Sequence, residues 1–205
     1  MVDFPGATPE ILVKIIILSV LCAIIGILFC VAIRGVSFYM HKFFRNPYIR
    51  TIVGSLIIVG LTMILKTTDY NGAGMHMISQ AMEGTTKTWA FAYKIIFTAI
   101  TIAAGFKGGE IVPTLFIGST FGCIMGPVLG LDASFAASIG FVAMFCGVVN
   151  CPFASVALAL EVFGADGITV YALACAVSFM MSGNFSIYKS QKIEGSKIAY
   201  EEITE

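Results

Sequence analysis

The chain has 205 residues, of which 58% are hydrophobic and only 12% are charged, and its mean hydropathy is +0.94. A soluble globular domain carries roughly 25% charged residues, so this composition excludes that class and indicates an integral membrane protein. The formal net charge is zero, which gives no electrostatic reason to expect nucleic acid as a partner. The lipid bilayer is the partner that the composition predicts.

The first apolar segment begins at a recognisable helix start. Thr8 is a candidate N-cap, and Pro9 suits the first helical turn because it has no N–H to leave unpaired. We expect a helix from Thr8 to about Phe44, long enough to cross a bilayer, which needs about 20 apolar residues. The densest basic cluster between two apolar segments follows and places this connection in the cytoplasm by the positive-inside rule; it contains His41, Lys42, Arg45 and Arg50.

The later apolar segments are shorter, and Gly or Pro interrupts nearly every junction. Helices are expected over 51–65, 75–82, 90–104, 111–129, 133–145, 151–163 and 168–181. Discontinuous helices whose ends meet near the midplane are typical of transporters and channels built from inverted repeats. The predicted fold class is an all-α integral membrane bundle of about seven short, tilted and discontinuous apolar helices. One membrane domain is expected over 1–191, with a short charged cytoplasmic tail over 192–205.

The chain is organised around the stretch from Gly105 to Pro113 and the glycine-spaced helix after it. Pro113 suits a first helical turn, so this helix should begin near Ile111. The first N–H groups of a helix have no intrahelical partner, and the helix dipole makes this end weakly positive, so it attracts anions. One interpretation is an anion site formed by the backbone N–H groups of Ile111 and Val112. The alternative is a tight turn between helices that binds nothing.

Three ionisable residues and the cysteines admit more than one interpretation. Lys94, near the start of an apolar helix, is expected to snorkel to the interface, with a polar interior as the alternative. Glu161, near the negative end of a helix dipole, needs a partner; we favour a structural hydrogen bond to a neighbouring helix end over a proton relay. His76 is expected to face water at a loop edge rather than serve a proton or metal site. The six cysteines lie in or beside apolar runs without a CxxC pair, which favours buried thiols over disulfides or metal ligands.

At three places the sequence resembles the CLC chloride channels and proton-coupled anion antiporters. The run GGEIVP at 108–113, followed by TLFIG at 114–118, is similar to the GxFxP motif that opens one of the family's ion-binding helices. The run GVVNCPF at 147–153, leading into ALE at 159–161, is similar to the helix pair near the family's dimer interface. Tyr188 follows a Gly-rich break at the spacing of the family's inner-gate tyrosine. The resemblance extends from about Thr8 to about Gln191.

The sequence also departs from the family pattern. Ile111 stands where the family usually has Phe, and Glu110 replaces a small or apolar residue. The GSGxP serine loop and the GREGP or GKEGP gating glutamate, which belong to the first half of a CLC subunit, are absent. The resemblance therefore implies the second half of a subunit, one of two inverted repeats, incomplete alone and working as a homodimer or with a complementary N-terminal half.

The resemblance implies transport of chloride, fluoride or another halide as a channel or an anion/proton antiporter, without a cofactor. It implies a bacterial inner membrane and a cytoplasmic C-terminus. The implied anion-binding residues are Gly109, Glu110, Ile111, Val112 and Tyr188, with Gly108 and Pro113 forming the turn and the helix N-terminus. Glu161 and Lys94 are candidates for structural or proton-linked roles, and no metal ligand is expected. For Tyr188 the alternative is an interfacial tyrosine.

A function of a different class remains open. The chain could be a non-transporting module that dimerises through helices over 133–163 and 168–181, whose many small residues suit close packing in lipid. An enzyme is not expected, because the HExxH and GxSxG motifs are absent.

Overall fold

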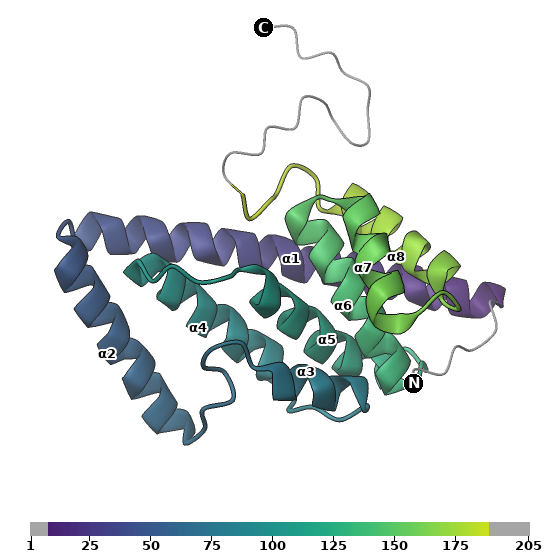
Figure 1. Cartoon of the computed structure of the whole chain (residues 1–205), viewed down its shortest axis with the longest axis horizontal. Coiled ribbons are helices and arrows are strands. Elements are labelled where there is room, and N and C mark those ends of the chain that lie inside the picture. Colours follow the sequence, from purple (N-terminus) through teal and green to yellow (C-terminus); the bar gives the residue numbers. More distant parts are fainter. Residues whose placement is uncertain (1–7, 189–205) are drawn as a thin grey trace, which may run out of the picture.

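A computed structural model describes residues 8–188, and this part of the chain forms eight α-helices and no strand (Figure 1). They are α1 (Pro9–Phe43), α2 (Pro47–Leu65), α3 (Met75–Met82), α4 (Ala90–Ala104), α5 (Ile111–Val128), α6 (Ala133–Val149), α7 (Pro152–Phe163) and α8 (Ile168–Met181). The all-α prediction is confirmed, including the short helix expected over 75–82, which is α3. The expected charged tail over 192–205 lies outside the described residues.

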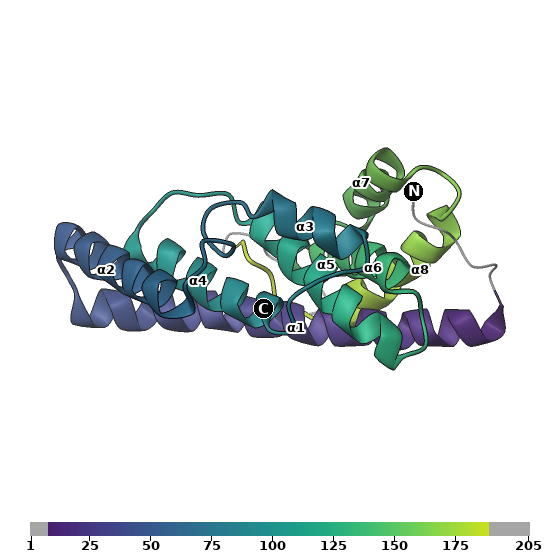
Figure 2. The same cartoon turned by 90° about the horizontal axis from the view of Figure 1, so that it is seen from below.

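Helix α1 is the longest helix in the described part of the chain. It runs for 35 residues, and the Thr8 side chain caps it by accepting a hydrogen bond from the Ile11 N–H at 3.5 Å, as predicted. In Figure 2, α1 runs along the lower edge of the molecule, and among the helices above it α4, α5, α6 and α8 pack against it. Within the described residues, three helices, α1, α2 and α5, are long and apolar enough to cross a membrane, while α4, α6, α7 and α8 are shorter apolar helices.

Helices α5 and α6 form the closest contact in the core. A Cβ atom added at Gly118 would overlap the Gly140 carbonyl oxygen, and one added at Gly122 would overlap the Ala136 carbonyl oxygen. Helices approach this closely only where small residues line the contact, which is a common way of packing helices in membranes. The middle of α5 is therefore held against the backbone of α6 rather than against flexible side chains.

Helix α6 is buried along almost its whole length, because every residue from Phe135 to Val149 is covered by the rest of the chain. The hypothesis that this chain dimerises through its 133–163 region is therefore wrong for α6, whose small residues face α5, α1 and α8 within the same chain. Helices α7 and α8 keep exposed apolar side chains, of which Phe153 is 91% exposed.

The helix ends follow the local signals in the sequence. Asp132 caps α6 by accepting a hydrogen bond from the Phe135 N–H at 2.9 Å. Gly105 ends α4 with φ +98°, a left-handed conformation that glycine adopts without strain. All six cysteines are free thiols, and all except the half-buried Cys151 are buried, so they pack as small apolar side chains, as expected.

Candidate functional site

The first turn of α5 presents two open backbone donors. The helix begins at Ile111, and its first backbone hydrogen bond runs from the Thr114 N–H to the Glu110 carbonyl at 3.3 Å. Within residues 8–188 the N–H groups of Ile111 and Val112 donate to no acceptor, and Pro113 has no N–H. The helix start and its unpaired amides are therefore where the sequence predicted them.

Two cavities lie on either side of this first turn. The Lys94 cavity, of about 510 Å³, is lined by the α4 residues Lys94, Thr98 and Thr101, by the α2–α3 loop residues 70–73, and by Gly108, Gly109, Val112 and Pro113. The Tyr188 cavity, of about 400 Å³, is lined by Glu110 and Tyr188 together with Arg34 and Ser37 of α1. Ile102 lines both cavities, so it stands between them. The predicted site residues from 108 to 113 thus divide between two adjoining spaces.

Hydrogen bonds connect the segment that carries Tyr188 to α1 and to the end of α6. The Ile187 N–H donates to the Val148 carbonyl at 3.1 Å, and the Asn150 side-chain amide donates to the Phe185 carbonyl at 2.8 Å. The Arg34 guanidinium donates to the Ser186 carbonyl at 2.5 Å. The Tyr188 side chain is 40% exposed, and its hydroxyl has no hydrogen-bond partner in the described part of the chain, so it is free to donate.

Sequence reasoning missed the two residues that place Tyr188. Asn150 ends α6 with φ +58°, a conformation that asparagine tolerates better than most residues. The signal for it was the Asn-Cys-Pro run that separates two helices. Arg34 is a single cation at the end of a long apolar run, which is expensive in lipid and usually marks a polar contact.

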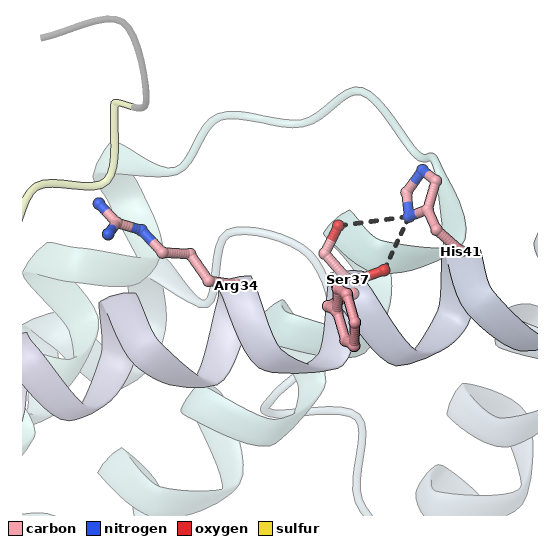
Figure 3. A pocket seen from close by; sticks show the side chains of 4 residues that line it. Arg34, Ser37 and His41 are labelled. Atoms are coloured by element: carbon pink, nitrogen blue, oxygen red, sulfur yellow. Dashed lines mark hydrogen bonds between the residues drawn. The ribbon is translucent and has the colours of Figure 1, made fainter.

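A third hollow of about 640 Å³ adjoins the Tyr188 cavity along α1, and Arg34, Ser37 and His41 line it (Figure 3). The His41 Nδ1 lies 2.7 Å from the Ser37 carbonyl oxygen. Because a carbonyl oxygen only accepts, Nδ1 must carry the proton in this contact. Basic side chains therefore lead from the α1–α2 connection toward Tyr188.

Lys94 does not snorkel, so that prediction is wrong. Its side chain is 1% exposed, and Nζ donates to the Gly72 carbonyl at 2.6 Å and to the Tyr70 carbonyl at 3.2 Å. It also lies 4.9 Å from the centre of the Phe116 ring, within the range of a cation–π contact. The α2–α3 loop supplies both of these carbonyl acceptors. A lysine at the membrane interface would instead donate its hydrogen bonds to water.

The other two ionisable candidates lie away from the cavities. His76 is exposed and pairs with Asp69 at 3.2 Å, and Lys87 pairs with the other oxygen of the same carboxylate. The hydrogen bond from Lys87, followed by one from Thr67, lowers the pKa of Asp69 to about 2. No group of His, Cys, Asp or Glu side chains in residues 8–188 could hold a metal ion.

Glu161 is exposed and has no hydrogen bond or ion pair with another described residue, so the predicted bond to a helix end is wrong. It lies on α7, near the end of that helix.

Glu110 occupies the N-cap position of α5, but its side chain makes no capping hydrogen bond. The Glu110 side chain is partly buried and lines the Tyr188 cavity. The cavity that contains Tyr188 therefore also contains a protonatable group.

Comparison with known proteins identifies the family. The family model described as voltage gated chloride channel matches residues 2–183. A chloride/fluoride channel protein of Pseudomonas syringae pv. tomato is 33% identical over 178 residues, which are 84% of this chain and 39% of that protein. The H(+)/Cl(−) exchange transporter ClcA of Vibrio vulnificus is 27% identical over 162 residues, 71% of this chain and 34% of that protein.

The fold agrees with a solved structure of the same family. The crystal structure of a CLC-type fluoride/proton antiporter superimposes with a TM-score of 0.90 at 27% identity, covering 94% of this chain and 49% of that one. The chain thus spans between a third and a half of the length of the relatives it matches. It belongs to the CLC family of voltage-gated chloride channels, and it is an integral membrane protein.

Proposed function

We propose that this chain carries a halide, fluoride or chloride, across a membrane as the second half of a CLC-type channel or anion/proton antiporter. The observation that carries the proposal is the first turn of α5, where the Ile111 and Val112 amides are unpaired and lie between two cavities. A bare anion deep in a bilayer is costly, and oriented N–H and O–H dipoles that replace its hydration shell make such a site feasible.

In this proposal the Tyr188 hydroxyl supplies the third donor. Tyr188 lies in the same cavity as Glu110, and the bonds from Asn150 and Arg34 to its segment reduce the entropy lost when it holds an ion. Gly108 and Gly109 line the opposite cavity without side chains, which leaves the backbone accessible. Arg34 and His41 would attract anions toward Tyr188 from one side of the membrane, which we assign to the cytoplasm together with the C-terminus.

The choice between fluoride and chloride, and between a channel and an antiporter, rests on two kinds of support. The relatives described above include a chloride/fluoride channel protein and a fluoride/proton antiporter. The Glu110 carboxyl lines the Tyr188 cavity, and a group that can take up a proton beside the ion is what coupling to protons requires. Together these favour fluoride with proton exchange, in a bacterial plasma membrane.

We further propose that the pathway is completed by a complementary half or by a second copy. The serine loop and the gating glutamate expected from the first half of a subunit do not occur in this sequence. The exposed apolar side chains of α7 and α8, with Phe153 the most exposed, would then cover a partner subunit rather than lipid.

The test is anion efflux from liposomes that contain the purified chain, read with fluoride and chloride electrodes, with and without a complementary N-terminal half. Halide binding is measured in parallel by calorimetry in detergent. Tyr188→Phe removes one donor and should weaken halide binding by about 1.5–3 kcal/mol, because the lost hydrogen bond is to a charged partner.

Trp89→Phe, at an exposed residue outside both cavities, serves as the control and should bind as the wild type does. Equal halide affinity of Tyr188→Phe and the wild type would contradict the role of Tyr188. No flux from the chain with or without its complementary half would contradict the transport function.

A further inference from the structure

Lys94 places a positive charge inside the protein without an acidic partner. Its side chain is 1% exposed, and no carboxylate lies within 4.0 Å of it in the described part of the chain. Its two hydrogen-bond acceptors are neutral backbone carbonyls, which satisfy donors but do not neutralise a charge. A buried charge is expensive unless an opposite charge is near, so the Lys94 cavity favours an anion.

A second side chain in this cavity has an unused donor. Most helical Ser and Thr hydroxyls here donate to the carbonyl three or four residues earlier, as Thr101 does to Phe97 at 2.7 Å. Thr98 is different, because it is 7% exposed and its hydroxyl has no hydrogen bond within residues 8–188. The Thr98 oxygen keeps some accessible surface, and Thr98 lines the Lys94 cavity, so the hydroxyl opens on that cavity.

The two side chains lie on one face of α4. Lys94 and Thr98 are four residues apart, which places them one helical turn apart, and both line the Lys94 cavity. Neither lines the Tyr188 cavity, from which Ile102 separates them. A buried cation and a free hydroxyl on the same wall are the donors that a small monovalent anion requires.

We infer that the Lys94 cavity holds a second halide-binding position, formed by the Lys94 ammonium and the Thr98 hydroxyl and distinct from the position at Tyr188. The inference rests on the proposed halide function and deepens it, since an ion would occupy the two cavities in turn on either side of Ile102. Two weak positions in series allow an ion to enter and to leave, whereas one tight position would retain it.

The experiment measures fluoride and chloride binding by calorimetry on the purified chain, with gluconate as the balancing anion. All variants carry Tyr188→Phe, which weakens the position at Tyr188, so that the Lys94 cavity contributes more of the remaining binding. Adding Thr98→Val removes the free hydroxyl at nearly constant volume and should weaken this binding at least about tenfold. Thr120→Val is the matched control, because its hydroxyl already donates to the Phe116 carbonyl within α5 and lines none of the three cavities, and it should change the affinity by less than about threefold.

Lys94→Met adds a test of the charge and is scored only where size-exclusion chromatography shows a monodisperse sample. Equal binding by the Thr98→Val and Thr120→Val proteins would overturn the second position, whether or not Lys94→Met folds. If Tyr188→Phe alone abolishes all halide binding, the second position is overturned while the proposed function stands. If Tyr188→Phe binds as the wild type and Thr98→Val weakens binding, the second position is supported and the assignment of Tyr188 fails.

Discussion

Replacing Gly122 by alanine should force α5 and α6 apart. The added Cβ would overlap the Ala136 carbonyl oxygen, and it would lie 3.0 Å from the carbonyl carbon of Ala136 and 3.1 Å from the Ala137 Cα. A backbone cannot rotate away as a flexible side chain can, so the helices would need to separate by roughly 1 Å to restore ordinary contact distances. Overpacking of this kind costs about 1–3 kcal/mol, and occasionally more.

Gly60→Ala is the matched control for this change. Gly60 lies inside α2, and a Cβ added there meets nothing within 4 Å. Alanine at this position is expected to stabilise the protein by about 0.4–1 kcal/mol, because it restricts the unfolded chain without strain. The two variants should therefore differ by about 1.4–4 kcal/mol in the free energy of unfolding.

The difference is measured by titrating both variants with denaturing detergent and following helical circular dichroism. Because α5 carries the Ile111 and Val112 amides at its N-terminus, Gly122→Ala should also weaken halide binding, whereas Gly60→Ala should not. Equal unfolding midpoints for the two variants would refute the argument that a direct backbone contact holds α5 in place.

Two further predictions concern the loop before α3 and the support of Tyr188. Because the pKa of Asp69 is lowered in the folded chain, its ionised carboxylate stabilises the fold fully at pH values above 3.8, its ordinary pKa. This stabilisation is lost as the pH falls toward about 2. As the pH falls through this range, the thermal unfolding midpoint of the wild type should therefore approach that of Lys87→Met. A difference between the two midpoints that persists at the lower pH would contradict a stabilising contact between Lys87 and the Asp69 carboxylate. Asn150→Gly keeps a residue that accepts φ +58° but removes the amide that holds the Phe185 carbonyl. It should weaken Tyr188-dependent halide binding by about 0.5–1.5 kcal/mol in calorimetry, and an affinity equal to that of the wild type would show that Asn150 does not position Tyr188.

The parts of the fold that were predictable depend on residues close together in the sequence. Thr8, Gly105 and Asp132 each set a helix end through a contact with a residue three or fewer positions away, or through their own backbone angle. The start of α5 follows in the same way from Pro113, which needs only the geometry of one turn. For this reason the helices and the open amides of α5 could be placed without knowing the packing.

The parts that could not be predicted depend on contacts between distant segments. The acceptors of Lys94 lie 22 and 24 residues earlier in the chain, on a loop whose path the sequence does not reveal. Asn150 reaches Phe185, 35 residues away, and Arg34 reaches Ser186, 152 residues away. Lys94 was therefore expected at the interface, since a charged side chain without a known partner is cheapest in water.

The burial of α6 has a consequence for how the protein enters the membrane. From Phe135 to Val149 no residue of α6 lies on the surface of the chain, so in the finished fold this apolar helix has almost no contact with lipid. Only the short turn around Gly130 separates it from α5, which is itself long enough to span. During synthesis the two helices should therefore leave the translocation machinery as one hairpin. The glycines at the contact between α5 and α6 then affect whether this hairpin forms during insertion, as well as the stability of the finished protein.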